Sequence, residues 1–230
     1  MRRKLFTFAA MVALCTAADV FTQTRRTAAA AAKPAATAAA IPAVDMGTVA
    51  GRMYRNNAFN FELTIPDGWL IADAKSEASL KTNGVDLHLK APKAGNQQEQ
   101  TRLNGYAKRV TVLLTAFHPQ SKDENTVMRV AVEDLRRFPQ VKDAVDYFDL
   151  MREDYMTMRL PSDFKYSDTK AEKLGKRQFG FLDTQSAEAK TRMYATVRNG
   201  YAILFTLNYR SDDDLQAFRQ ILADGNFSLK

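Results

Sequence analysis

The sequence predicts an α+β fold in which an antiparallel β-sheet is flanked by α-helices. Three observations carry this prediction. Apolar and polar residues alternate from Phe59 to Ile65, as they do on a strand with one buried face. Asn199-Gly200 joins two runs rich in β-branched and aromatic residues, which is typical of a two-residue type I′ hairpin. Residues 140–158 place apolar side chains three or four positions apart, which indicates an amphipathic helix packed on a sheet.

Residues 1–18 have the features of a secretory signal peptide. A positive start, Met1-Arg-Arg-Lys4, precedes the apolar residues 5–15, and Thr16-Ala-Ala18 offers small residues for cleavage. The apolar segment is too short to span a bilayer as a stable helix. We therefore expect a mature chain that starts at Asp19 and lies in the periplasm or outside the cell.

Two alternatives to cleavage stay open at this N-terminus. Cys15 is the only cysteine and could carry a lipid, although the residue before it is Leu14 and not the small residue that a lipobox requires. An uncleaved segment could also tether the protein to the membrane. A disulfide framework is excluded, and a cysteine-free mature domain suits an oxidising compartment.

Residues 19–45 are predicted to form an Ala/Pro-rich disordered linker, because Pro34 and Pro42 interrupt the alanine run. Residues 46–230 then form a single α+β domain, for which a 46% apolar content of the chain is sufficient. The net charge is +7, but residues 1–44 hold six Lys and Arg against one Asp. The domain itself is nearly balanced, which argues against a nucleic-acid partner.

Further strands are predicted by alternation and turn signals at residues 49–55, 85–90, 108–117, 165–173, 177–186, 191–198, 201–209 and 227–229. Residues 127–135 fit either a strand or a helix, and we favour a strand because residues 120–125 have the length of a hairpin loop. After Ile65, the turn Pro66-Asp-Gly68 directs the only tryptophan, Trp69, toward the core.

The second predicted helix begins after Ser211, an N-cap residue, and ends at Gly225. Three aspartates, residues 212–214, lie in its first turn, where the helix dipole favours negative charge. Residues 74–81 are either one exposed helical turn or an irregular edge. Residues 91–103 are polar and rich in glutamine, and we predict a mobile loop there.

Few residues point to chemistry, and the sequence identifies no catalytic, cofactor-binding or metal-binding residue. Asp86 and His88 share one face of a predicted strand, but two ligands do not make a metal site. A Ser-His-Asp hydrolase would need His88 or His118 beside an activated serine, and no Gly-x-Ser-x-Gly motif is present. The aspartates at 212–214 lack the spacing of a calcium loop and favour helix capping. No cofactor is expected.

Two clusters have a structural and a functional interpretation. Lys170, Lys173, Lys176 and Arg177 surround a predicted turn at Gly175, with Phe179 and Phe181 beyond it. We favour a solvated hairpin end over a site for an anionic lipid or polymer. Likewise, Met151, Met156 and Met158 near the end of the first helix are expected in the core and not in a partner groove.

The sum of these features resembles the PsbP-like α/β/α sandwich family. The resemblance lies in Phe-x-Phe-x-x-x-Ile-Pro-x-Gly-Trp at residues 59–69, the helix at 140–158, the Asn199-Gly200 hairpin and the closing residues 222–229. It implies a non-enzymatic accessory or binding role outside the cytoplasm, and it transfers no ligand residue.

The sequence therefore predicts an exported accessory or binding protein of the cell envelope with a protein partner. The alternatives are a hydrolase with an unrecognised active site and a structural protein tethered to the membrane.

Overall fold

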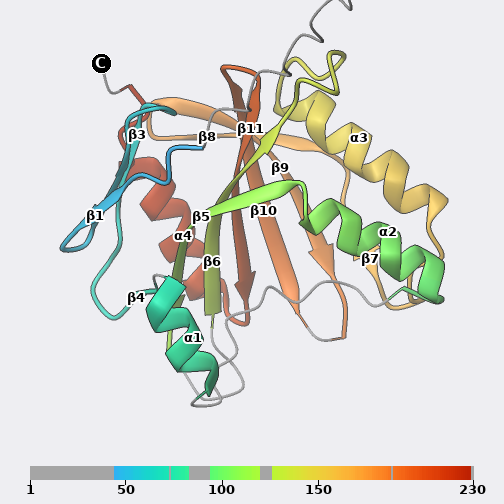
Figure 1. The fold of residues 1–230 in the computed structure, drawn as a ribbon, viewed down its shortest axis with the longest axis horizontal. Coiled ribbons are helices and arrows are strands. Elements are labelled where there is room, and N and C mark those ends of the chain that lie inside the picture. Colours follow the sequence, from blue (N-terminus) through green and yellow to red (C-terminus); the bar gives the residue numbers. More distant parts are fainter. Residues whose placement is uncertain (1–43, 73, 83–93, 120–125, 188, 229–230) are drawn as a thin grey trace, which may run out of the picture. The chain divides into compact units, whose positions relative to one another are not determined.

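The computed structural model describes residues 44–72, 74–82, 94–119, 126–187 and 189–228 (Figure 1). The predicted signal peptide, most of the predicted linker, the predicted strand at 85–90 and the loop at 120–125 lie outside these residues. Asp86 and His88 therefore also lie outside them. Among the described helices, none is long and apolar enough to cross a membrane.

Within the described ranges, the strands form two antiparallel sheets. The smaller has three strands in the order β1-β2-β3, which are Thr48–Ala50, Met53–Asn56 and Phe61–Thr64. The larger has eight strands, in the order β4-β5-β6-β11-β10-β9-β7, with β8 also paired to β9. Its strands are β4 (Leu70–Ala72), β5 (Val110–His118), β6 (Thr126–Asp134), β7 (Lys165–Tyr166), β8 (Lys170–Leu174), β9 (Arg177–Gln185), β10 (Lys190–Arg198) and β11 (Tyr201–Tyr209).

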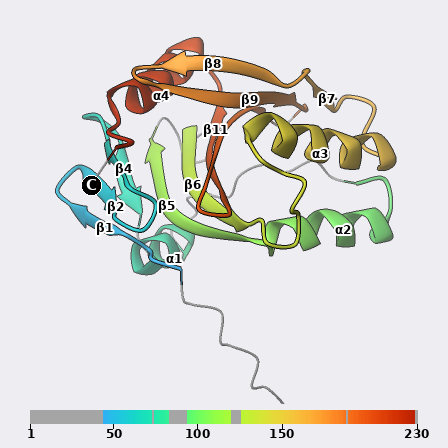
Figure 2. The same ribbon diagram turned by 90° about the horizontal axis from the view of Figure 1, so that it is seen from above.

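The described residues form four helices beside the sheets: α1 (Ala74–Thr82), α2 (Gln97–Ala107), α3 (Ala144–Thr157) and α4 (Asp212–Asp224). Helix α3 contacts β9 and β10 on one face of the large sheet, whereas α4 contacts β8, β11 and β3 on the other (Figures 1 and 2). The large sheet is thus buried on both faces. The predicted fold class, an antiparallel sheet flanked by helices, is confirmed.

Side-chain size differs between the two faces of the large sheet. Toward α4 and the small sheet, the core contains large side chains such as Phe179, Tyr194 and Phe205. Toward α3, the sheet presents mostly small residues such as Ala195, and a Cβ on Gly180 would lie 2.8 Å from the Cβ of Ala144. The close approach of α3 therefore depends on glycine at position 180.

The corner at Trp69 is confirmed. Gly68 has a φ of +84°, the backbone N–H of Trp69 donates to the carbonyl oxygen of Pro66 at 3.3 Å, and Trp69 is 4% exposed. Arg52 stabilises the corner by donating to the carbonyl oxygens of Ile65 at 2.7 Å and Trp69 at 3.2 Å. The alternating apolar residues before the corner are all buried, namely Phe59, Phe61, Leu63 and Ile65.

Several other predictions are confirmed. The hairpin between β10 and β11 turns at Asn199 and Gly200, which have φ values of 52° and 76°. Residues 127–134 belong to strand β6, which pairs with β5 and β11, and Leu135 follows its end, so this segment is a strand and not a helix. Ser211 caps α4 in a capping box with Asp214, and Gly225 is its C-cap.

Other predictions are wrong in detail. Residues 49–55 form two strands, because Gly51, with a φ of 61°, closes a tight turn between them. Residues 165–173 are divided between β7 and β8, and residues 226–228 make one isolated bridge, between Asn226 and Glu62, instead of a strand. The first helix starts at Ala144 and not at residue 140, because the Asp143 side chain caps it.

The predicted mobile loop at 91–103 is also wrong. Helix α2 occupies Gln97–Ala107, and residues 74–82 form the regular helix α1. The side chain of Asn96 accepts a hydrogen bond from the backbone N–H of Glu99 at 2.9 Å and so caps α2. Arg102 joins α2 to the end of α3 through the hydroxyl of Thr157 at 3.2 Å.

Candidate functional site

His118, at the end of β5, is held by a buried carboxylate. Its Nδ1 lies 3.3 Å from Oδ1 of Asp214, and its ring stacks on Trp69. Asp214 is 4% exposed, and its Oδ2 accepts hydrogen bonds from the hydroxyls of Thr126 and Ser211, both at 2.8 Å. In the tautomer that donates from Nδ1, Nε2 is the nitrogen left to act as a base.

This pair provides part of what a hydrolase needs. A carboxylate orients the histidine, as in Ser-His-Asp enzymes. However, the hydroxyl of Ser211 donates to Asp214 and not to His118. Within the described ranges, no hydroxyl is hydrogen-bonded to His118, so the pair has no serine nucleophile there.

A charged cluster lies on the face of the large sheet that α4 covers. Arg192 on β10 donates to both carboxylate oxygens of Asp183 on β9, at 2.5 and 2.7 Å. Its guanidinium also lies 4.3 Å from the centroid of the Phe181 ring, and its side chain is 15% exposed. Asp183 and Arg192 are direct neighbours in the strand register, so the sheet itself sets this pair.

Glu172 on β8 extends the cluster to α4. It accepts a hydrogen bond from the hydroxyl of Tyr194, pairs with Arg219 of α4, and lies 3.9 Å from Arg192. Burial and then the bond to Glu172 raise the pKa of Tyr194 to about 12. Two arginines face two carboxylates, so the charges cancel. We call these five residues, Glu172, Asp183, Arg192, Tyr194 and Arg219, the balanced cluster, and its contacts join α4 and β8 to the sheet.

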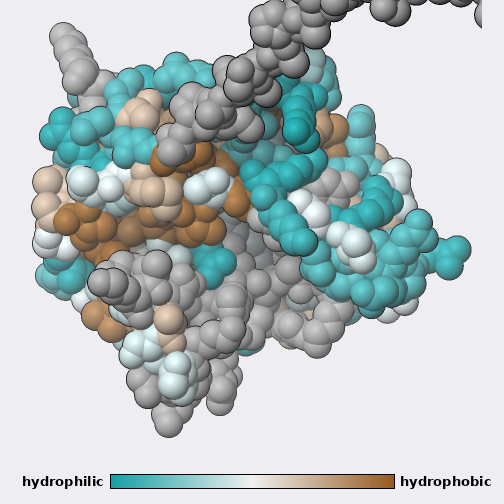
Figure 3. Space-filling model, in the orientation of Figure 1, coloured by the Kyte–Doolittle hydropathy of each residue, from teal (hydrophilic) through white to brown (hydrophobic). Residues whose placement is uncertain are grey.

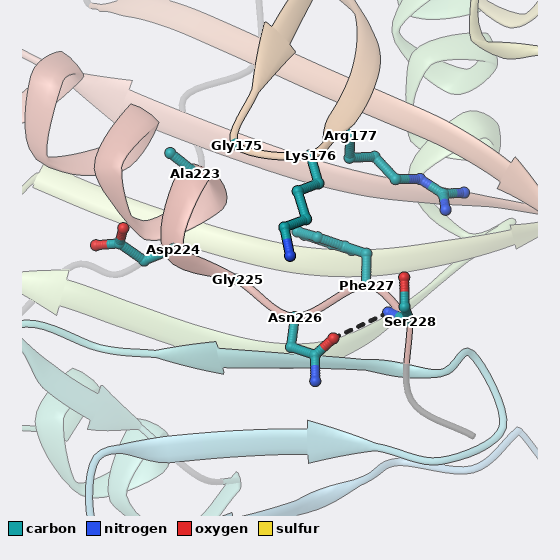
Figure 4. A pocket seen from close by; sticks show the side chains of 9 residues that line it. All are labelled: Gly175, Lys176, Arg177, Ala223, Asp224, Gly225, Asn226, Phe227 and Ser228. Atoms are coloured by element: carbon teal, nitrogen blue, oxygen red, sulfur yellow. Dashed lines mark hydrogen bonds between the residues drawn. The ribbon is translucent and has the colours of Figure 1, made fainter.

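The basic turn found in the sequence lines a pocket of about 560 Å³ (Figure 4). One wall is the turn between β8 and β9, and the other is the end of α4 with the residues that follow it. Gly175 has a φ of +56°, and a Cβ there would lie 2.1 Å from the carbonyl oxygen of Ala223. Glycine is therefore required for this close approach. The pocket residues are Gly175, Lys176, Arg177, Ala223, Asp224, Gly225, Asn226, Phe227 and Ser228.

The cations around this pocket have neutral hydrogen-bond partners. Arg177 donates to the hydroxyl of Thr196 at 3.2 Å. Arg198, on the neighbouring strand, donates to the backbone oxygens of Phe59, Asn60 and Phe227 at 3.0 to 3.3 Å. In the part of the chain that the structure describes, no carboxylate lies within 4.0 Å of the charged nitrogens of Lys176, Arg177 or Arg198. Burial lowers the pKa of Arg177, and the positive charge of Arg198 lowers it further.

A second pocket, of about 370 Å³, opens at the opposite end of β9. Lys165 and Lys190 line it together with Asp183 of the balanced cluster. Both lysines are exposed, so their charges are solvated, unlike that of the half-buried Arg177. They therefore form a control pair for the first pocket.

An apolar surface forms a third candidate site. Apolar residues gather on the left of Figure 3, where Figure 1 places the β1–β3 sheet, and continue toward β5. In contrast, the surface over α2 and α3 is mostly hydrophilic (Figure 3). Leu70 is 51% exposed, and Met46 and Val49 are each 50% exposed. We define the apolar face by the exposed large apolar residues of β1, β2, β4, β5 and the segment before β1, which are Met46, Val49, Met53, Leu70 and Val112.

The three methionines of the first predicted helix differ in their exposure. Met158 is buried and Met151 packs against the α3 core, as expected. Met156 is 65% exposed, so its predicted place in the core is wrong. Val145, also on α3, is 41% exposed. These two exposed apolar residues lie outside the apolar face and can serve as a control for it.

Among the residues that the structure describes, no three His, Cys, Asp or Glu side chains are grouped to hold a metal ion. The aspartates at 212–214 instead begin α4. Asp214 serves in its capping box, as the sequence predicted.

No family model and no curated protein matches the chain. Among solved structures, it is similar to cyanobacterial PsbP from Synechocystis sp. PCC 6803, with 15% identity, a TM-score of 0.41, and coverage of 78% of this chain and 97% of that one. It is also similar to a protein of unknown function from Pseudomonas aeruginosa, with 13% identity, a TM-score of 0.38, and coverage of 75% and 93%. These likenesses concern the fold and transfer no residue role.

Sequence reasoning found the basic turn and His118, but it missed the balanced cluster and the apolar face. The cluster joins residues from three strands and a helix, and only the strand register brings them together. The apolar face contains Val49 and Met53, which were expected inside one strand and instead flank the turn of the β1–β2 hairpin.

Proposed function

We propose that this protein is an exported accessory protein of the cell envelope, which binds a protein partner and catalyses no reaction. The observation that carries the proposal is the apolar face. Contiguous apolar surface is uncommon on soluble proteins that act alone, and it is typical of protein interaction sites. The predicted signal peptide supports export, and the order of elements supports membership of the PsbP-like family.

Affinity capture tests the partner proposal. The full-length protein would be captured from the envelope of its own cells after Val49→Thr and Met53→Gln are introduced together. We expect the partner bound by the unchanged protein to be lost, because both substitutions place polar groups in the apolar face. Val145→Gln with Met156→Gln is the matched control, since it removes two similarly exposed apolar residues from α3.

Equal recovery of the same partner by both variants would reject the apolar face as the binding surface.

Mass spectrometry of the native protein tests export separately. A chain that starts at Asp19 agrees with cleavage, whereas a chain that keeps Met1 or carries a lipid on Cys15 favours a membrane tether.

The hydrolase alternative is favoured by one observation, the pair formed by His118 and Asp214. As a base, His118 would activate water, since no serine is bonded to it in the described ranges. Ester turnover that is abolished by both His118→Ala and Asp214→Asn, with thermal midpoints that show folded proteins, would support this alternative and contradict a purely binding role.

A further inference from the structure

We infer that the pocket between the β8–β9 turn and the end of α4 binds a phosphate group. The residues of this pocket are not residues of the apolar face, and the inference does not depend on the proposed partner. Lys176 and Arg177 line it, and Arg198 donates to the carbonyl oxygen of Phe227 in its wall. None of these three cations has a carboxylate partner within the residues described. A bound dianion would supply the missing negative charge.

The burial of Arg177 distinguishes this site from a solvated hairpin end. A guanidinium in water tolerates a positive neighbour, because water screens the repulsion. Arg177 is half-buried, and its pKa is lowered first by burial and then by the positive charge of Arg198. The hydrogen bond from Arg198 to the carbonyl oxygen of Phe227, a pocket residue, places this second guanidinium beside the same pocket. The hydroxyl and carbonyl oxygens around them satisfy hydrogen bonds but bring no formal negative charge.

The end of α4 offsets only part of this charge. A helix C-terminus carries roughly half a negative charge, and α4 has no basic residue in its own last turn. Lys176 therefore also complements the helix end. The nearest acidic residue of the pocket, Asp224, accepts hydrogen bonds from Gln220 at 2.8 Å and points away from Lys176 (Figure 4). The pocket keeps a net positive charge.

The neutral groups of the pocket suit a tetrahedral oxyanion. Lys176 extends from the turn across the pocket toward the residues after α4 (Figure 4). Oδ1 of Asn226 accepts from the backbone N–H of Ser228 at 3.1 Å, which leaves the amide nitrogen of Asn226 as a donor. The hydroxyl of Ser228 is a further donor. The pocket lining thus combines charged and neutral hydrogen-bond donors, and phosphate oxygens accept hydrogen bonds from both kinds.

The pocket is larger than a phosphate ion, so the phosphate is either free or part of a larger molecule such as a phospholipid. Calorimetric titration of the full chain with inorganic phosphate tests the shared chemistry. We expect Lys176→Gln with Arg177→Gln to weaken binding at least about tenfold, because charge-assisted hydrogen bonds are lost. Lys165→Gln with Lys190→Gln removes the same charge from the second pocket and should leave the affinity within about twofold.

Lys176→Gln alone is the variant least expected to misfold, since Lys176 is exposed and its side chain makes no hydrogen bond to the residues that the structure describes. It should weaken phosphate binding while the thermal midpoint in phosphate-free buffer is unchanged. Flotation with phosphatidylcholine vesicles, with and without phosphatidic acid, then identifies the source. Flotation that requires both phosphatidic acid in the vesicles and Arg177 in the protein indicates a lipid headgroup. Binding of inorganic phosphate in the calorimeter without flotation of the protein indicates a soluble phosphate. Equal affinities for all variants, or no binding in either assay, would overturn the inference.

Discussion

The balanced cluster and the phosphate pocket use the same residue types on the same sheet face. Arg192 and Arg198 are an even number of residues apart along β10, and so are Arg177 and Asp183 along β9. Because side chains alternate between the two faces of a strand, all four lie on the same face of the sheet. The two regions differ in their partners. Arg192 pairs with the carboxylates of Asp183 and Glu172, whereas Arg177, among the described residues, donates to the hydroxyl of Thr196 and has no carboxylate partner.

This difference separates a structural role from a binding role. A partly buried arginine that is paired with carboxylates is stabilised within the fold, and removing it leaves those carboxylates unpaired. An arginine without a carboxylate contributes less to folding and can contribute more to binding an anion. The comparison can therefore be tested by substituting the two kinds of arginine in the same way.

The largest effect is expected for Arg192→Gln. The substitution leaves Asp183 without its bidentate partner and removes the cation that lies over Phe181. We expect a loss of about 3 to 5 kcal/mol in the free energy of unfolding, measured by urea denaturation. A loss below about 1 kcal/mol would show that the balanced cluster does not stabilise the fold.

An intermediate effect is expected for Tyr194→Phe, on the pH dependence of the free energy of unfolding. Burial and then the bond to Glu172 raise the pKa of Tyr194 in the folded state to about 12, above the usual tyrosine value of 10.0, so the folded state favours the protonated hydroxyl. Its contribution to stability is therefore complete below about pH 10 and is lost as the pH rises toward 12.

Tyr194→Phe should accordingly reduce the loss of stability between pH 9 and pH 11.5 by about 2 kcal/mol. Denaturation of both proteins at the two pH values measures this difference. Tyr54, whose pKa burial also raises to about 12, stays unchanged in both proteins and serves as the internal reference. Identical pH dependence in the two proteins would show that Tyr194 ionises as freely as it does in the unfolded chain.

The smallest effect is expected for Lys176→Gln without phosphate. Lys176 is exposed and has no carboxylate partner among the described residues, so only its interaction with the end of α4 is lost. The free energy of unfolding should change by less than about 0.5 kcal/mol. A loss larger than about 1.5 kcal/mol in phosphate-free urea denaturation would place Lys176 with the structural residues of the balanced cluster.

Local sequence signals predicted the elements that depend on local chemistry. The Asn199-Gly200 turn requires two positive φ values that Asn and Gly tolerate, and Ser211 satisfies the N–H groups at the start of α4. The corner at Trp69 is likewise fixed by Pro66 and Gly68. Such features depend on a few adjacent residues, so the sequence alone identifies them.

The errors arise where the signal is weak or non-local. Helix α2 has few apolar residues, so no stripe revealed it, and only the cap at Asn96 marked its start. The hairpin of β1 and β2 turns at Gly51, and a single glycine is too weak a signal to divide the strand predicted at residues 49–55. The balanced cluster depends on the register of β8, β9 and β10, which no local pattern determines.

Paired unfolding of Arg177→Gln and Arg192→Gln, each with and without inorganic phosphate, tests the central claim most directly. Phosphate that binds the folded state raises stability by mass action. We predict that Arg192→Gln loses about 3 to 5 kcal/mol in both buffers but keeps the increase that phosphate gives the unchanged protein. Arg177→Gln should remain within about 1 kcal/mol of the unchanged protein without phosphate and lose most of that increase. Equal destabilisation by the two substitutions, with the phosphate increase intact in both, would contradict the assignment of one arginine to structure and the other to binding.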